Sequence, residues 1–343
     1  MKIFYLSVHS VLEYDEVSLF SELGHDIFSW GAYTYPQGHP SLPRPGIPGL
    51  PFHADLADLS RRFPRTEIPI EMLDWADVII IMDGAGMHDV IELNWAKLKG
   101  RNVIWRTIGQ STPNVENRLS KYRSEGLKIV RYSPMEDKLK NYIGGDATIR
   151  FYKDPTEFSG WNGKEARVIN FTQTLKGRRI FCGYEPIMKL MDGFPSKIYG
   201  SGNEDLGSYN GGELPYDLMK GVLRDSRVYI YRGTWPASYT LTTIEALMTG
   251  IPVVSVGSDI GNMGKHEGVE TYEMQHIIKN NENGFVSDDL DYLRTKIKEL
   301  LVDESLAKKI GEAGRKRAIE LFGRETIRGQ WQSFFDSLNI KDE

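Results

Sequence analysis

Residues 234–257 combine a carboxylate, several hydroxyls and an expected helix start at a spacing that suits an anionic, hydroxyl-rich ligand. A polar loop comes first, and the hydroxyl of Thr240 or Thr242 can cap the helix that follows. A strand, loop and helix in this order place free backbone amides and a positive dipole end where an anion binds. Glu245 lies more than one turn inside the helix, too deep to cap it, so its carboxylate can accept hydrogen bonds from ligand hydroxyls.

The apolar residues of the same segment predict the elements that position Glu245. Apolar side chains recur at helical spacing, and Gly250 followed by Pro252 ends the helix. The valine-rich run at 253–256 predicts a parallel strand that is buried on both faces. An ordinary Rossmann-type helix and strand without a ligand is the alternative interpretation of this pattern.

The segment resembles the donor-site signature of the family 4 retaining nucleotide-sugar glycosyltransferases, which share the GT-B fold. That signature is Glu, seven residues and a second Glu, followed by Ala, Gly, Pro and Val. Its second half is matched by Glu245, Ala246, Gly250, Pro252 and Val253, whereas Ala237 replaces the first Glu. In the family the second Glu holds the donor ribose and the first lies near the sugar hydroxyls and the reaction centre. The resemblance therefore implies a ribose role for Glu245 and leaves sugar choice and rate open.

A cationic loop follows the strand expected at 167–171. Lys176 and the glycine after it resemble the Lys-Gly of the family loop that grips the donor diphosphate. The family's partner Arg has no match, because Phe171 stands at its place, and Arg178 or Arg179 could substitute. Positive charge at this loop would stabilise a departing nucleoside diphosphate. A capping or surface role is the alternative for each of these three cations.

The resemblance also implies which backbone groups contact the donor. Amides around Ser238, Tyr239, Thr240 and Leu241 would hold the phosphate or the sugar. Glycine-containing turns would read the nucleobase, and the candidates for these turns are Gly200 and Gly212.

Polar residues at strand ends of the amino-terminal half are the candidates for acceptor binding, because open α/β sheets bind ligands at the carboxyl ends of their strands. His9 and Ser10 follow the first expected strand, His88 follows the strand expected at 77–82, and Arg106 ends the strand expected at 103–106. His9 could equally be a structural loop histidine. For Arg106, pairing with a core carboxylate is slightly favoured. The histidine that relatives place near the last of these strand ends is not found here.

The stretch 97–131 has an excess of basic residues, with Glu116 and Glu125 as its only acids. Such a surface could meet anionic lipid, a polyphosphate glycan or DNA. A solvated helix surface that is balanced by acidic residues elsewhere is the favoured interpretation.

A proline- and glycine-rich loop at 36–51 is either a mobile flap on the acceptor side or a passive surface loop.

The whole chain predicts an α/β protein with two Rossmann-like, doubly wound domains facing a central cleft, which is the GT-B architecture. We expect an acceptor-binding domain at 1–155, a nucleotide-sugar domain at 165–322, and a helix at 323–343 that packs back across the interdomain seam.

Length supports two domains, since the chain has 343 residues, and the formal net charge of −5 argues against wholesale coating of nucleic acid. The single cysteine, Cys182, excludes a disulfide framework and suits a cytoplasmic location. Peripheral contact with the inner membrane face stays open.

The function expected from the resemblance is metal-independent, retaining transfer of a sugar from a nucleotide sugar, with a UDP sugar favoured over a GDP sugar. The acceptor would be a hydroxyl of a glycan or a lipid-linked glycan. No cofactor or essential metal is expected. Asp289 and Asp291 match the Asp-x-Asp pattern of metal-dependent transferases, but they lie in an expected helix without the surrounding residues that would support a metal site. Two alternatives stay open: a phage-type DNA glycosyltransferase acting on hydroxymethylated bases, and a nucleotide-sugar epimerase or inactive binder on the same fold. Oligomeric state is not predicted.

Overall fold

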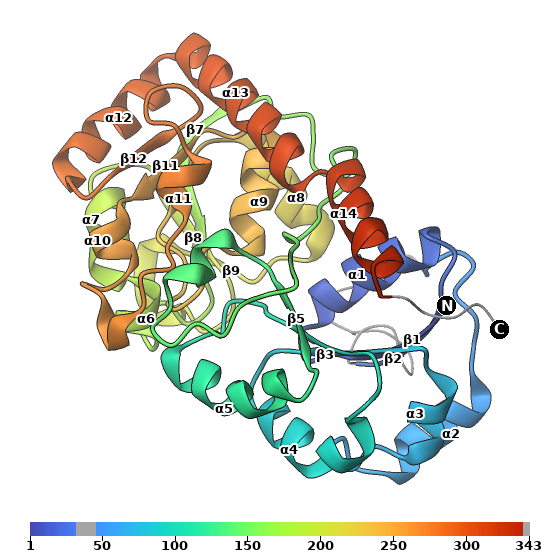
Figure 1. The fold of residues 1–343 in the computed structure, drawn as a ribbon. Coiled ribbons are helices and arrows are strands. Elements are labelled where there is room, and N and C mark those ends of the chain that lie inside the picture. Colours follow the sequence, from blue (N-terminus) through green and yellow to red (C-terminus); the bar gives the residue numbers. More distant parts are fainter. Residues whose placement is uncertain (32–45, 339–343) are drawn as a thin grey trace. The chain divides into compact units, whose positions relative to one another are not determined.

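The computed structural model describes residues 1–31 and 46–338 and divides the chain into two compact units (Figure 1). One unit comprises Met1–Tyr152 with Ile327–Glu343, and the other comprises Lys153–Thr326. Most of the predicted proline- and glycine-rich loop at 36–51 lies outside the described residues.

The first unit is built on a six-stranded parallel sheet of order β2-β1-β3-β4-β5-β6. Its strands are β1 (Lys2–Leu6), β2 (Asp26–Trp30), β3 (Val78–Met82), β4 (Val103–Arg106), β5 (Lys128–Arg131) and β6 (Ala147–Thr148). The flanking helices are α1 (Ser10–Glu22), α2 (Ala54–Arg62), α3 (Ile70–Trp75), α4 (Met87–Leu98), α5 (Pro113–Ser124) and α14 (Arg324–Asp336), with a 3-10 turn η1 (Pro134–Lys138). The edge strand β6 is short and pairs with β5 through Ala147 and Thr148.

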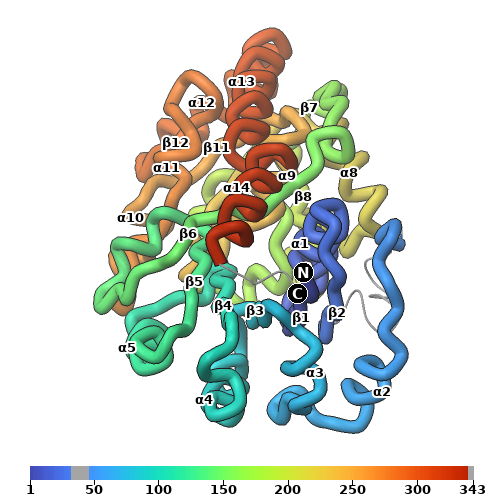
Figure 2. Tube along the Cα trace, turned by 45° about the vertical axis from the view of Figure 1, so that its right-hand side comes forward, coloured from blue at the N-terminus to red at the C-terminus, as the bar shows by residue number. Residues whose placement is uncertain are grey.

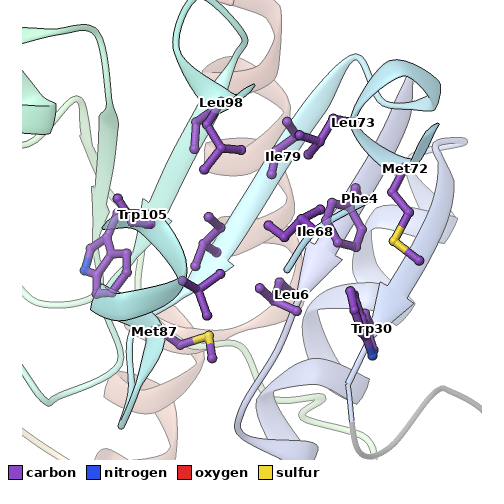
Figure 3. Close-up of a cluster of buried hydrophobic side chains, with 14 of the residues drawn as sticks. Phe4, Leu6, Trp30, Ile68, Met72, Leu73, Ile79, Met87, Leu98 and Trp105 are labelled. Atoms are coloured by element: carbon purple, nitrogen blue, oxygen red, sulfur yellow. The ribbon is translucent and has the colours of Figure 1, made fainter. Parts of the chain in front are cut away.

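Strand residues that alternate across this sheet form its apolar core. Phe4 and Leu6 of β1, Ile79 of β3 and Trp105 of β4 point to the same side and meet side chains from the covering helices (Figure 3). The carboxy-terminal helix α14 covers other residues of the same unit, where the Trp331 ring packs edge-on against Phe20 of α1 at a centroid distance of 4.9 Å. The carboxy-terminal helix expected beyond 322 thus forms part of the first unit.

The second unit is a six-stranded parallel sheet of order β12-β11-β10-β7-β8-β9. Its strands are β7 (Glu165–Phe171), β8 (Ser196–Tyr199), β9 (Asn210–Gly212), β10 (Ser226–Tyr231), β11 (Val253–Val256) and β12 (Phe285–Ser287). Its helices are α6 (Arg179–Cys182), α7 (Tyr184–Met191), α8 (Tyr216–Asp225), α9 (Leu241–Thr249), α10 (Ser258–Gly261), α11 (Met274–Ile277), α12 (Leu290–Val302) and α13 (Glu304–Phe322), with 3-10 turns η2 (Glu204–Tyr209) and η3 (His266–Gly268). Helices α9 and α13 pack together, and α12 lies against β11 and β12 (Figure 2).

Two local features of the second unit have clear physical reasons. Helices α6 and α7 are separated at Gly183, whose φ of +68° suits glycine. The segment 154–164 belongs to the second unit and packs on its sheet. There the Trp161 indole Nε1 donates to the backbone oxygen of Ser226 at 2.8 Å.

Candidate functional site

The order of the second sheet reverses between β7 and β10. From β7 the chain proceeds outward to β8 and β9, and then returns to the other side of β7 to form β10, β11 and β12. In open parallel sheets, ligands bind beyond the carboxyl ends of the strands at such a switch point. The loops that follow β7, β8 and β10 therefore define the candidate site, and they carry most of the predicted donor residues.

The loops after β7 and β8 are fixed to each other by Asn203, whose side chain is fully buried. Its amide nitrogen donates to the backbone oxygens of Thr172 and Gly200, at 2.7 and 3.0 Å. Its amide oxygen accepts from the backbone nitrogen of Leu175 at 2.9 Å. Asn203 thus holds the loop that carries Lys176, and sequence reasoning missed this role because the partners are distant in the chain.

Glycines allow the close approach of these loops. A side chain at Gly200, where φ is +133°, would place its Cβ 2.7 Å from the Thr172 oxygen. The Gly200 nitrogen also donates to the Gly212 oxygen at 3.0 Å, so these two predicted residues lie side by side. Their paired backbone adjoins the cationic loop, because Asn203 holds Gly200 and that loop together.

The three predicted cations of this loop are all exposed. Lys176 Nζ lies 3.3 Å from an Asp205 carboxylate oxygen, and Arg179 pairs with Glu185. Arg178 is the N-cap residue of α6 and forms no ion pair within the described part of the chain. The loop therefore presents positive charge to solvent, although two of its three cations already have an acidic partner.

The segment between β10 and α9 positions the predicted backbone amides. Ser238 and Tyr239 are buried, and the Tyr239 ring packs against Phe322 at a centroid distance of 5.2 Å. Thr240 is the N-cap of α9, as predicted, but its side chain forms no capping hydrogen bond. First-turn amides of a helix have no partner within the helix, and a helix start without a side-chain cap, such as that of α9, favours a bound anion.

Glu245 is almost fully buried in α9 and forms an ion pair with Lys153. Lys153 Nζ lies 2.8 Å from Glu245 Oε1, and the two side chains are 1% and 5% exposed. A carboxylate has about four lone-pair sites, so the Glu245 group can accept hydrogen bonds beyond the contact with Lys153. Nothing local in the sequence indicated Lys153.

A second functional candidate that sequence reasoning missed is Arg232, the first residue after β10. It is 2% exposed, and burial lowers the pKa of its guanidinium. Its Nη1 donates to the Phe181 oxygen and, at 3.4 Å, to the Gly233 oxygen. Its Nη2 donates to the Ile260 oxygen at 3.4 Å. Among the described residues no carboxylate pairs with this cation.

The predicted acceptor-side residues of the first unit have different environments. His9 is the N-cap of α1, where its Nδ1 accepts from the Leu12 nitrogen at 3.4 Å, and Ser10 is the first residue of that helix. Arg106 is fully buried, with its Nη2 2.7 Å from Glu16 Oε1. This is the core-pairing alternative, so Arg106 is not placed to meet a ligand at the surface.

Two titratable residues, His88 and Asp83, follow β3 in the sequence. The His88 ring lies 4.8 Å from that of Trp105, and burial lowers the pKa of His88 to about 4. Asp83 follows β3 directly and is fully buried. Burial, and next the charge of Glu136, raise the pKa of Asp83 to about 8, so this carboxyl is largely protonated at neutral pH. Sequence reasoning did not single out Asp83, because its neighbours come from other strands.

The basic residues of 97–131 are largely paired. Lys99 lies 2.9 Å from Glu125, and Arg131 is buried 2.7 Å from Glu116. Acidic residues outside the stretch pair with others: Arg101 with Asp74, Arg118 with Asp89, and Arg123 with Asp146. These pairs match the balanced-surface interpretation and remove most of the free positive charge that motivated a DNA or membrane partner.

Within residues 1–31 and 46–338 the structure has neither a metal-binding cluster nor a membrane-spanning helix. No group of three or more His, Cys, Asp or Glu side chains is arranged to hold a metal ion. None of the helices combines the length and apolar character that crossing a bilayer requires. Asp289 of the Asp-x-Asp pattern is the N-cap of α12, where its carboxylate accepts from the Asp291 and Tyr292 nitrogens.

Comparison with known proteins agrees with this geometry. A family model described as glycosyl transferase-like matches residues 182–323, which contain the loop after β10, α9 and Glu245. No curated protein sequence matches the chain.

Solved structures share the fold over most or nearly all of the chain. The sucrose-phosphate synthase of Thermosynechococcus elongatus has a TM-score of 0.67 at 14% identity, covering 98% of this chain and 99% of that one. The HepE protein of Anabaena, in complex with UDP-glucose, has a TM-score of 0.66 at 12% identity, covering 98% and 100%. The pneumococcal O-GlcNAc transferase GtfA, in complex with UDP and GlcNAc, has a TM-score of 0.53 at 13% identity, covering 79% and 59%. The family model thus covers less than half of the chain, and the solved structures show that the two parallel sheets with their flanking helices are a shared fold.

Proposed function

We propose that this protein is a retaining glycosyltransferase that moves a sugar from a UDP sugar to a hydroxyl of a glycan or a lipid-linked glycan. The observation that carries the proposal is the state of Glu245. Its Oε1 lies 2.8 Å from Lys153 Nζ, and both side chains are almost fully buried. A carboxylate held in this way on α9, a turn inside an uncapped helix start, is suited to accept hydrogen bonds from a ribose.

Each part of the donor has a matching element in the second unit. The ribose hydroxyls would donate to the Glu245 carboxylate, and the amides at the start of α9, around Thr240 and Leu241, would donate to phosphate or sugar oxygens. Lys176 would interact with the diphosphate from the opposite loop. The paired backbone of Gly200 and Gly212 would border the nucleobase.

The chemistry that fits these groups needs no protein base. The acceptor oxygen would attack C1 of the sugar on the face of the leaving group, while the bond between C1 and the β-phosphate oxygen breaks. The acceptor proton would pass to an oxygen of the leaving phosphate, so the products are the glycoside and UDP. Negative charge grows on the diphosphate during this step, and Lys176 with Arg178 or Arg179 would stabilise it. Neither a protein nucleophile nor a metal ion takes part in this scheme.

UDP is the proposed nucleotide because UDP or UDP-glucose occupies solved structures that share the fold, HepE and GtfA among them. For this chain the assignment rests on that likeness and on the sequence resemblance. We place the reaction in the cytoplasm. A reducing cytoplasm suits the single cysteine, Cys182, which is a free thiol, and the cytoplasm is where nucleotide sugars would be available.

A second function on the same fold is favoured by one specific feature. Ala237 provides no carboxylate at the position where relatives have a Glu near the reacting sugar. A nucleotide-sugar epimerase or a binder without transfer activity would tolerate this loss. An epimerase would change the free nucleotide sugar in the absence of any acceptor.

The test is a transfer assay with EDTA present, followed by NMR of the product. The protein is incubated with UDP-glucose, UDP-GlcNAc or UDP-galactose and a set of glycan and glycolipid acceptors, and UDP release is followed. The proposal predicts acceptor-dependent UDP release and a product with the α-configuration of the donor. A β-linked product would contradict retention, and conversion of the donor without acceptor would favour the epimerase.

A further inference from the structure

Arg232 is a buried cation for which the fold provides no countercharge. It directly follows β10, beside the switch point of the second sheet, and its side chain packs against Gly183 between α6 and α7. A Cβ at Gly183 would lie 2.7 Å from the Arg232 Cγ and Cδ atoms. The guanidinium therefore occupies space that only a glycine leaves open.

Backbone oxygens satisfy this guanidinium only in part. An arginine has five N–H donors, and here the contacts to Gly233 and Ile260 are both long, at 3.4 Å. The Nε donor is buried and has no hydrogen-bond partner among the described residues. Taking an ion out of water without an opposite charge is costly, so the retention of Arg232 calls for an explanation beyond folding.

A second orphan donor lies three residues along the same loop. The indole Nε1 of Trp235 is buried and has no hydrogen-bond partner in the described part of the chain. Phe181 connects the two residues, because its backbone oxygen accepts from Arg232 Nη1 and from the Trp235 nitrogen, and its ring stacks on Trp235 at 5.7 Å. Two unsatisfied donors of this kind, one of them positively charged, match a ligand that is rich in acceptor oxygens and negatively charged.

We propose that Arg232 binds a phosphate oxygen of the nucleoside diphosphate. It supplies the positive charge that is missing at Phe171, the position where related transferases have an arginine. This inference rests on the proposed function, because it places the diphosphate at the same strand ends. The neighbouring cations support it: Lys176 and Arg179 are already paired with acids, whereas Arg232 has no acidic partner within the described residues. Trp235 Nε1 is the second donor of this subsite.

The inference predicts opposite effects on folding and on binding. In Arg232→Gln the uncompensated charge is gone, and the amide can still donate to the Phe181 oxygen. The melting temperature of the ligand-free protein should therefore stay the same or rise. The dissociation constant for UDP should increase about 10- to 100-fold, the range expected when a charged hydrogen bond is lost. The dissociation constant for uridine, which has no phosphate, should change by less than about threefold on the same scale.

Arg315→Gln is the matched control. Arg315 is also held by backbone oxygens, those of Phe158, Met248 and Pro155, and burial also lowers its pKa. It lies near the carboxyl end of α9, away from the loops of the site. Its replacement should lower the melting temperature and leave the ratio of UDP to uridine affinity unchanged. Arg232→Lys, which keeps the charge, should recover part of the UDP affinity.

Calorimetric titration with UDP, uridine and inorganic pyrophosphate separates the possible results. If wild type binds UDP and Arg232→Gln keeps the same ratio of UDP to uridine affinity, the inference is wrong while the proposed function stands. A parallel loss of uridine and UDP affinity would show that Arg232 only supports the fold, which also overturns the inference. If the wild-type protein binds neither UDP nor pyrophosphate, both the inference and the proposed function fail. Pyrophosphate binding that is lost in Arg232→Gln supports the subsite even if the nucleobase is not uracil.

Discussion

Lys153 and Glu245 form a buried ion pair in which Nζ and Oε1 lie 2.8 Å apart. The two residues come from distant parts of the chain: Lys153 begins the second unit, and Glu245 lies inside α9. The backbone nitrogen of Lys153 also donates to the backbone oxygen of Phe322, the last residue of α13, at 3.0 Å. The carboxylate proposed to hold the ribose is therefore positioned by the segment where the chain enters the second unit.

Removing one member of this pair should destabilise the fold. Glu245→Ala leaves the Lys153 ammonium buried without its partner, and we expect a loss of about 3–5 kcal/mol in the free energy of unfolding. Glu245→Gln keeps a hydrogen bond to Lys153 and should cost less. Denaturant unfolding measures both, with Asp291→Ala as the control, because its exposed pair with Lys189 should contribute at most about 1 kcal/mol. Equal stabilities of Glu245→Ala and the control would contradict the buried pair.

The ribose role of Glu245 has a separate test that does not depend on stability. In Glu245→Gln, Lys153 should retain the amide oxygen, so that the NH₂ group replaces Oε2 and no acceptor faces the ribose. Wild type should bind UDP about 10- to 100-fold more tightly than 2′-deoxy-UDP or 3′-deoxy-UDP, and the variant should lose most of this preference for at least one analogue. Titration calorimetry measures the ratio. A variant with the full preference of wild type would remove Glu245 from the ribose site.

Lys176 should affect turnover rather than folding. The side chain is exposed, and its contact with Asp205 is 3.3 Å long, so Lys176→Ala should change the free energy of unfolding by no more than about 0.5 kcal/mol. Loss of a group that stabilises charge on the leaving diphosphate should lower kcat about 100- to 1,000-fold. Lys189→Ala, which removes another exposed and paired lysine of this unit, is the control. Near-normal turnover of Lys176→Ala would exclude it from the reaction.

Asp83 gives the first unit a pH dependence of defined sign. The pKa of this carboxyl is about 8 in the folded protein, above its usual value of 3.8, because of burial and the charge of Glu136. Between these two values the folded state holds a proton that the unfolded state has lost. This carboxyl therefore lowers stability as pH rises from about 4 to about 8, by at most about 1.4 kcal/mol per pH unit. Asp83→Asn should gain stability relative to wild type at pH 8 and much less at pH 5, which thermal unfolding at the two pH values would show. An equal effect at both would contradict the raised pKa.

The sequence was most informative where structure depends on near neighbours. The valine run predicted β11, which is buried on both faces between β10 and β12, and Gly250 ends α9 with a φ of +96°, as its position before Pro252 predicted. The helix start was predicted at Thr240 or Thr242, and Thr240 is the N-cap of α9, although no hydroxyl caps the helix as expected. These features follow from helix and strand periodicity and from the backbone preferences of glycine and proline.

Features that depend on distant partners could not be predicted in the same way. Asn203, Lys153 and Arg232 are ordinary polar residues in the sequence, and their roles appear only when their partners are known. The basic excess of 97–131 has the same explanation, since acids outside that stretch neutralise Arg101, Arg118 and Arg123. A local count of charges cannot show such pairing.

The central claim is that the second unit binds a nucleoside diphosphate sugar, and its most direct test is thermal unfolding of the full chain with a panel of nucleotides and nucleotide sugars, with and without a divalent metal. A ligand present at a hundred times its dissociation constant adds about 2.7 kcal/mol of stability, which gives a readable shift in the melting temperature. We predict stabilisation by UDP and a UDP sugar, without need of metal, and little or none by uridine. A melting temperature that no member of the panel changes would contradict the claim.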